Sequence, residues 1–187
     1  MSARFTDMVK ESFYFLEGVG FGLASTEDNR LRYESPTSMV VIDWDARSGE
    51  LEAFVGLQAS VGHPPETYSL TDVLGMEGVA DRKMPPQVAD EERLQPFVDR
   101  LADDLRVHAQ PALVGDRMFF RRLETFRRTN AEALTRGLQL QQVRSAVELA
   151  WRNREFKKVV GLYASVEDDL TEAEKGKLEY ARRHQAD

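Results

Sequence analysis

The sequence of 187 residues contains no cysteine and only three histidines. Without cysteine the chain cannot form disulfides, zinc–thiolate or iron–sulfur sites, and it has no thiol nucleophile. Long apolar runs are also missing, since none approaches the ~20 residues that a membrane-spanning helix needs. Glu11 and Glu17 interrupt the apolar stretch near the N-terminus, which is atypical of a secretory leader. We therefore expect a cytoplasmic chain with no membrane association.

Positive charge is scarce overall and unevenly placed. The chain has 25 Lys and Arg against 32 Asp and Glu, a net charge of -7, which argues against indiscriminate binding to nucleic acid. Residues 117–158 nevertheless carry eleven basic and four acidic side chains, a net charge of +7, so the remainder carries -14. This asymmetry indicates either a basic binding face or electrostatic attraction between two parts of one fold.

Apolar periodicity predicts an α+β fold. Phe5, Phe13 and Leu16 belong to a helical pattern that ends at Gly18, and alternating apolar residues in 31–35, 40–44 and 51–57 then predict an antiparallel meander of about four strands. Two Pro-Pro pairs in 61–90 predict a connector, with a short helix capped by Ser69.

Everything after Asp90 has helical periodicity. Asp116 is expected to cap a long helix whose Phe119, Leu123, Phe126 and Leu134 point inward and which ends at Gly137. Further helices are expected at 138–152 and 155–166, and a last one from the Thr171–Glu174 capping box to His184. The predicted segments are 1–60 (helix and sheet), 61–90 (connector) and 91–187 (helices), forming one compact unit.

Two resemblances follow from these patterns. The C-terminal hairpin resembles a single tetratricopeptide repeat, over about 45 of the 187 residues, at the positions Val143, Ala146, Val147, Ala150, Phe156, Val159, Tyr163, Val166 and Thr171, with Tyr180 and Ala181 opening the next frame. Val143 stands where that motif usually has Trp, and Thr171 where it has Pro. The resemblance implies either a repeat or simply a tightly packed helical hairpin.

The whole chain also resembles a family of uncharacterised bacterial small α+β proteins. The likeness lies in the order of elements, in residues 68–74 (Tyr-Ser-Leu-Thr-Asp-Val-Leu), and in the helices around 106–108 and 115–116. Many small bacterial proteins of this class neutralise toxins as immunity proteins, an analogy at the level of fold class.

No motif predicts catalysis. The glycines of 18–22 follow a helix and precede a strand, the reverse of a dinucleotide-binding loop. Asp43 and Asp45 point to the same side of a strand, but Asp45 begins a turn that continues to Gly49. His63, His108 and His184 each lack a second ligand at metal-binding spacing. We expect no catalytic residue, cofactor or metal site.

Two charged surfaces are the candidate contact sites. One is the exposed sheet face with Arg32, Glu34, Asp43 and Glu52, and the other is the basic helix with Arg117, Arg121, Arg122 and Arg128. They predict a non-catalytic protein-binding module, of the toxin-neutralising immunity type or the adaptor type, whose contacts weaken as salt rises. Two alternatives stay open: a nucleic-acid binder using the basic helix 117–136, and a small enzyme with an unrecognised site.

Overall fold

The computed structural model describes residues 3–58, 66–79 and 87–184, and it shows the predicted α+β fold. The chain divides into two compact units, Met1–Arg127 and Arg128–Asp187. The single compact unit expected from the sequence differs from this division. The chain forms two units because residues 128–139 carry no buried side chain, so this stretch belongs to neither apolar core.

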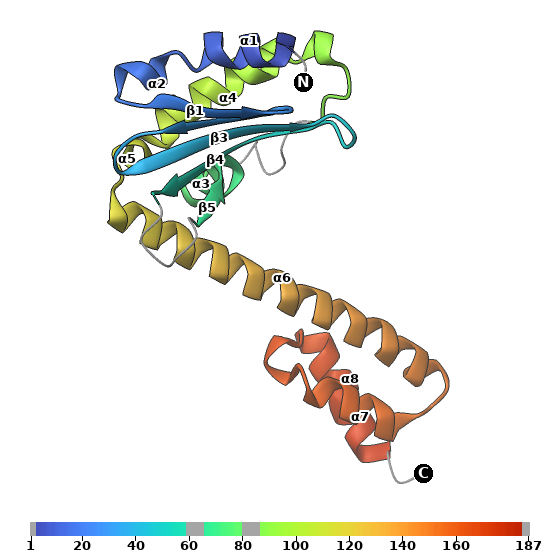
Figure 1. Ribbon diagram of the computed structural model, residues 1–187. Coiled ribbons are helices and arrows are strands. Elements are labelled where there is room, and N and C mark those ends of the chain that lie inside the picture. The colour runs from blue at the N-terminus through green and yellow to red at the C-terminus, as the bar shows by residue number, and fades with distance from the viewer. Residues whose placement is uncertain (1–2, 59–65, 80–86, 185–187) are drawn as a thin grey trace. The chain divides into compact units, whose positions relative to one another are not determined.

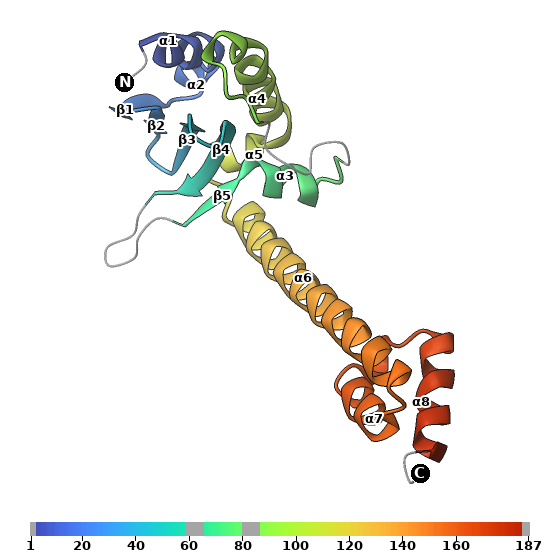
Figure 2. The same ribbon diagram turned by 90° about the vertical axis from the view of Figure 1, so that its right-hand side faces the viewer.

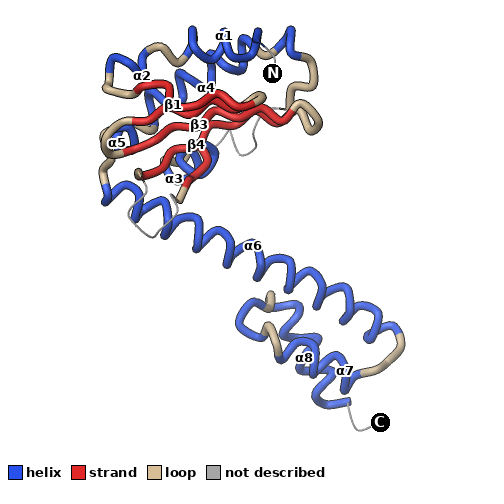
Figure 3. The backbone as a smooth tube through the Cα atoms, viewed as in Figure 1, coloured by secondary structure: helices blue, strands red, loops and turns tan. Residues whose placement is uncertain are grey.

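The N-terminal unit is built on one antiparallel sheet, drawn in red in Figure 3. Its strands follow one another in chain order: β1 (Gly22–Glu27), β2 (Arg30–Glu34), β3 (Ser38–Asp45), β4 (Glu50–Leu57) and β5 (Thr67–Ser69). The meander is as predicted, with a fifth short strand contributed by the connector. Its residues pair with Phe54–Gly56 of β4.

One face of the sheet is covered by helices. Figures 1 and 2 show α1 (Ala3–Ser12) and α4 (Gln95–His108) lying side by side over it. The remaining elements of this unit are α2 (Phe15–Gly18), α3 (Leu70–Met76), the 3-10 turn η1 (Glu91–Arg93) and α5 (Gln110–Leu113). Alternate strand residues such as Leu31, Ile42 and Leu51 are fully buried against these helices. The apolar alternation seen in the sequence therefore marks the helix-covered face.

The predicted helix caps are present. Ser69 Oγ accepts a hydrogen bond from the Asp72 amide at 3.0 Å, which starts α3. Asp116 Oδ1 accepts from the Met118 amide at 2.8 Å, which starts the long helix α6 (Arg117–Arg152). Pro96 lies in the first turn of α4, where a missing amide donor costs nothing.

The long helix α6 corrects two predictions. It continues through Gly137 to Arg152, because a single glycine inside a helix costs only about 1 kcal/mol and Gly137 retains an ordinary helical backbone. Leu134 was expected to face inward, but 67% of it is exposed. Phe119 and Leu123 are buried as predicted, since they lie on the part of α6 that belongs to the N-terminal unit.

The C-terminal unit packs the later turns of α6 against α7 (Phe156–Ala164) and α8 (Glu172–His184), with the 3-10 turn η2 (Glu167–Asp169) between them. Its core consists mostly of aliphatic side chains with one tyrosine: Val147, Ala150, Val159, Tyr163, Val166, Leu170, Leu178 and Ala181. Small residues at helix crossings let the backbones approach closely. Six of these eight positions are among those quoted for the repeat-like hairpin.

The Glu174 carboxylate links α6 to the start of α8 through hydrogen bonds. Its carboxylate accepts bonds from Arg144 at 2.6 and 3.1 Å, and from the amide and hydroxyl of Thr171 at 2.8 and 2.9 Å, which completes the predicted capping box. Hydrogen bonding to Arg144, above all, lowers the pKa of Glu174 to about 2. Since the pKa is depressed on folding, the stabilisation is complete above pH 4.5 and is lost as pH falls towards 2.

We therefore expect Glu174→Gln to flatten the acid sensitivity of this unit. Wild-type protection of the α8 amides, measured by hydrogen exchange with mass spectrometry after correction for intrinsic rates, should fall between pH 4.5 and 2. The variant should start with lower protection and lose less over the same range. Equal pH profiles would contradict this role for Glu174.

Candidate functional site

The four residues predicted on the sheet lie on one face, opposite the helix-covered face. Arg32 and Glu34 alternate along β2, and Asp43 of β3 pairs with Glu52 of β4. Arg32 and Glu34 form an ion pair of 2.6 Å, with about a third of each side chain exposed. Glu52 accepts a hydrogen bond from the Thr71 hydroxyl at 2.9 Å, and burial raises its pKa. The charges on this face are thus largely engaged within the chain.

A pocket of about 290 Å³ lies on the same face. Its lining is mostly polar and mixes both signs of charge: Ser25, Glu27, Arg30, Arg32, Met39, Val41 and Thr67. The Arg32 Nε atom is buried and has no hydrogen-bond partner among the described residues. Of the predicted contact residues, only Arg32 lines this pocket.

The four predicted arginines are exposed on α6, and the unit boundary separates them. Arg117, Arg121 and Arg122 belong to the N-terminal unit and Arg128 to the C-terminal one. Arg122 pairs with Glu77 at 3.3 Å, so its charge is partly offset. Arg117, Arg121 and Arg128 form no ion pair with any described residue. They remain available to an acidic partner.

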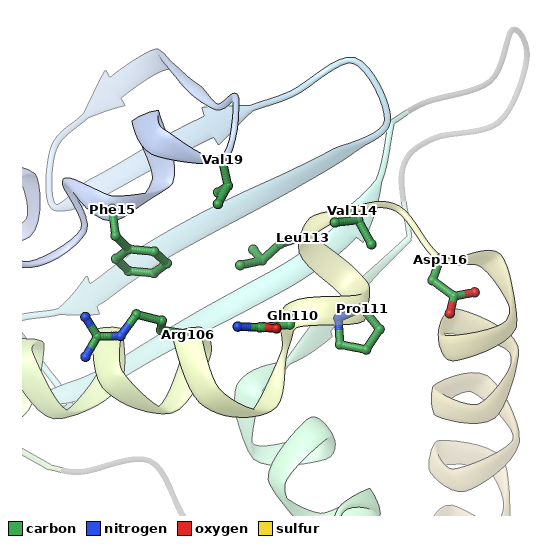
Figure 4. A pocket seen from close by; sticks show the side chains of 8 residues that line it. All are labelled: Phe15, Val19, Arg106, Gln110, Pro111, Leu113, Val114 and Asp116. Atoms are coloured by element: carbon green, nitrogen blue, oxygen red, sulfur yellow. The ribbon is translucent and has the colours of Figure 1, made fainter.

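A groove in the N-terminal unit is the larger of the two described pockets, with a volume of about 490 Å³. Figure 4 shows its lining, which comes from α2 and the residue after it, from the α4–α5 segment, and from the residue that caps α6. The lining residues are Phe15, Val19, Arg106, Gln110, Pro111, Leu113, Val114 and Asp116. None of the eight predicted contact residues is among them.

Short-range geometry explains how the chain builds this groove. Ser38 Oγ donates a buried hydrogen bond of 2.8 Å to the Leu113 carbonyl, which ties α5 to the first residue of β3. Gly115 has φ +74°, and a Cβ there would lie 2.6 Å from Thr37 Cβ. Only glycine therefore allows the turn that presents Val114 on one side and Asp116 on the other.

The groove exposes apolar side chains to water. Val114 is 72% exposed and Val19 is 53% exposed, and Met118 just beyond Asp116 is 61% exposed. Single exposed valines are common, but several around a hollow are typical of a binding surface. The groove is therefore suited to an apolar side chain from another molecule.

The groove has few polar side chains in its lining. Its lining has no Ser, Thr, Cys, His, Lys or Tyr, and its two titratable members each make contacts within the chain. Arg106 donates to Asp103 at 2.6 Å and lies over the Phe15 ring at 5.9 Å, while Asp116 caps α6. The other lining side chains are apolar, apart from the neutral amide of Gln110.

The two histidines within the described residues, His108 and His184, line neither pocket. His108 ends α4, and His184 stacks on Tyr180 with ring centroids 4.0 Å apart. His63 lies outside the described residues. Within residues 3–58, 66–79 and 87–184, no group of three or more His, Asp or Glu side chains is placed to hold a metal ion. In those same ranges, no helix has the length and apolar character needed to cross a membrane.

Sequence reasoning did not find the groove because its residues have no shared motif. Phe15 and Arg106 are 91 positions apart, and only the packing of α2 beside α4 brings them together.

Comparisons with known proteins add no relative. No protein-family model matches the chain, and neither the curated proteins nor the solved structures contain a significant match.

Proposed function

We propose that this protein is a non-catalytic protein-binding module, of the toxin-neutralising immunity type or the adaptor type, and that the groove is its contact site. The observation that carries the proposal is the exposure of Val114 and Val19 around a hollow with an apolar floor. Water contacts these side chains at a free-energy cost that a partner's apolar side chain would remove. Arg117 and Arg121, on the first two turns of α6, add positive charge beyond Asp116.

This proposal moves the contact away from the charged sheet face. On that face Arg32 and Glu52 already bond to Glu34 and Thr71, so a partner would have to replace interactions that exist. In the groove a partner would instead cover exposed apolar side chains. The compartment in which the contact forms is expected to be the cytoplasm, as the composition suggests.

The nucleic-acid alternative has weaker support. Arg122 is paired with Glu77, and Arg127 donates to the Thr67 carbonyl at 3.4 Å and lies over the Tyr68 ring. Phosphate binding would need these guanidinium groups to be released. A wild-type mobility shift on duplex or single-stranded DNA that is lost in Arg121→Glu would favour this alternative.

Affinity capture from the source cells tests the proposed function. We expect the wild-type protein to enrich a partner that Val114→Asp fails to retain, because the new carboxylate would be desolvated in the contact. Leu134→Asp is the matched control, since Leu134 is similarly exposed, at 67% against 72% for Val114, but lies in the other unit. Quantitative mass spectrometry of the three eluates supplies the measurement. A partner that all three proteins retain equally would contradict the groove as the contact site.

A further inference from the structure

The two ends of the groove carry opposite charges. In Figure 4, Arg106 and Phe15 lie at one end and Asp116 at the other, with Val19, Leu113 and Val114 between them. The middle is apolar, and its polar member is the neutral amide of Gln110. A ligand that follows the groove therefore meets a cation, an apolar stretch and an anion in turn.

The Arg106 end has unused hydrogen-bond donors. One η nitrogen donates to Asp103 at 2.6 Å, and the guanidinium lies 5.9 Å from the centre of the Phe15 ring. Asp103 is the only described residue that accepts a hydrogen bond from Arg106, so Nε and the other η nitrogen have none in the described part of the chain. Both can donate to a carboxylate.

The Asp116 end has an unused acceptor. Oδ1 accepts from the amides of Met118 and Phe119 at 2.8 and 3.4 Å, which is its capping role. Oδ2 accepts no hydrogen bond from any described residue. One oxygen of this carboxylate is therefore open to a cationic group at the far end of the groove.

We infer that the groove binds a short peptide segment of the partner in which an acidic and a basic residue flank an apolar residue. The acidic side chain bonds to Arg106, the apolar side chain contacts Leu113 and Val114, and the basic side chain pairs with Asp116. This inference rests on the proposed function and names the chemistry of the partner. The charges fix the direction of the peptide, because reversing it would place like charges together at both ends.

Selection of a random linear peptide library on the immobilised full-length protein tests this inference, with Val114→Asp as the counter-selection. Peptides enriched on the wild type should share an acid and a base on opposite sides of an apolar residue. Synthetic peptides with this pattern should bind Arg106→Glu at least tenfold more weakly. Replacing the peptide's acid by lysine should restore binding to that variant.

Two further variants separate charge from folding. Asp116→Asn keeps a good helix cap while it removes the negative charge, so it should weaken only peptides that carry the basic residue. Arg106→Gln should weaken binding without introducing repulsion. Three outcomes would each overturn the inference. The enriched peptides could lack the charge pattern, the charge variants could bind them as well as the wild type does, or no peptide could be enriched over Val114→Asp. Capture of a partner that depends on Val114 but not on Arg106 or Asp116 would leave the proposed function standing and reject this inference alone.

Discussion

Gly115→Ala is expected to lower the free energy of unfolding of the N-terminal unit by about 2–5 kcal/mol. A left-handed backbone costs a residue with a Cβ about 1–2 kcal/mol, and at φ +74° Gly115 has this conformation. The added methyl would also lie 2.6 Å from Thr37 Cβ and 2.7 Å from its hydroxyl oxygen. Overpacking of this kind typically costs about 1–3 kcal/mol. Urea denaturation of a Trp151→Phe background, in which Trp44 is the sole tryptophan, measures the effect on this unit.

Two companion variants divide the effect of Gly115→Ala into its causes. Adding Thr37→Gly should recover the part due to the contact and leave the backbone cost. Gly18→Ala should change stability by less than about 0.5 kcal/mol, since no atom lies within 4 Å of the position of its Cβ. A Gly115→Ala protein as stable as the Gly18→Ala protein would refute this account of the turn.

Trp44→Ala is expected to destabilise the same unit by about 3–5 kcal/mol, the usual range for removing a buried aromatic side chain. Trp44 is only 6% exposed and lies 5.7 Å from the Phe5 ring, so it joins β3 to α1. Its indole nitrogen also donates to the Val88 carbonyl at 3.0 Å. Val88 in turn donates to Gly49, which holds the segment leading to α4 against the sheet.

Trp44→Phe separates the contribution of the buried aromatic ring from that of the indole hydrogen bond. It keeps most of the apolar contact and leaves the Val88 carbonyl without its donor, so a loss of about 1–3 kcal/mol is expected. Urea denaturation followed by circular dichroism measures both variants. Losses below about 1 kcal/mol for Trp44→Ala would show that this side chain does not anchor the segment.

The elements that depend on local chemistry were predictable from the sequence. Ser69, Asp116 and Thr171 mark helix starts because a short polar side chain satisfies an exposed amide at that position. The meander was predictable because alternating burial along a strand leaves an alternating apolar pattern. The continuation of α6 through Gly137 was not, since the cost of one glycine is small against the hydrogen bonds of the turns on either side.

The candidate site was less predictable than the fold. The shared face of Arg32, Glu34, Asp43 and Glu52 followed from strand register. The hydrogen bond from Thr71 to Glu52 could not be predicted in this way, because it depends on where α3 begins relative to β4. The groove depends on three tertiary contacts, the approach of Phe15 to Arg106, the Ser38–Leu113 hydrogen bond and the close fit of Gly115 on Thr37. None of them has a sequence pattern.

The dissociation constant of the purified partner for wild-type, Val114→Asp and Leu134→Asp proteins tests the central claim most directly. Loss of one well-packed apolar contact to a buried carboxylate costs about 2 kcal/mol or more, which corresponds to about 30-fold. We predict that Val114→Asp binds at least about 30-fold more weakly, while Leu134→Asp stays within about twofold of the wild type. Equal affinities of all three proteins would contradict the assignment of the groove as a protein-binding site.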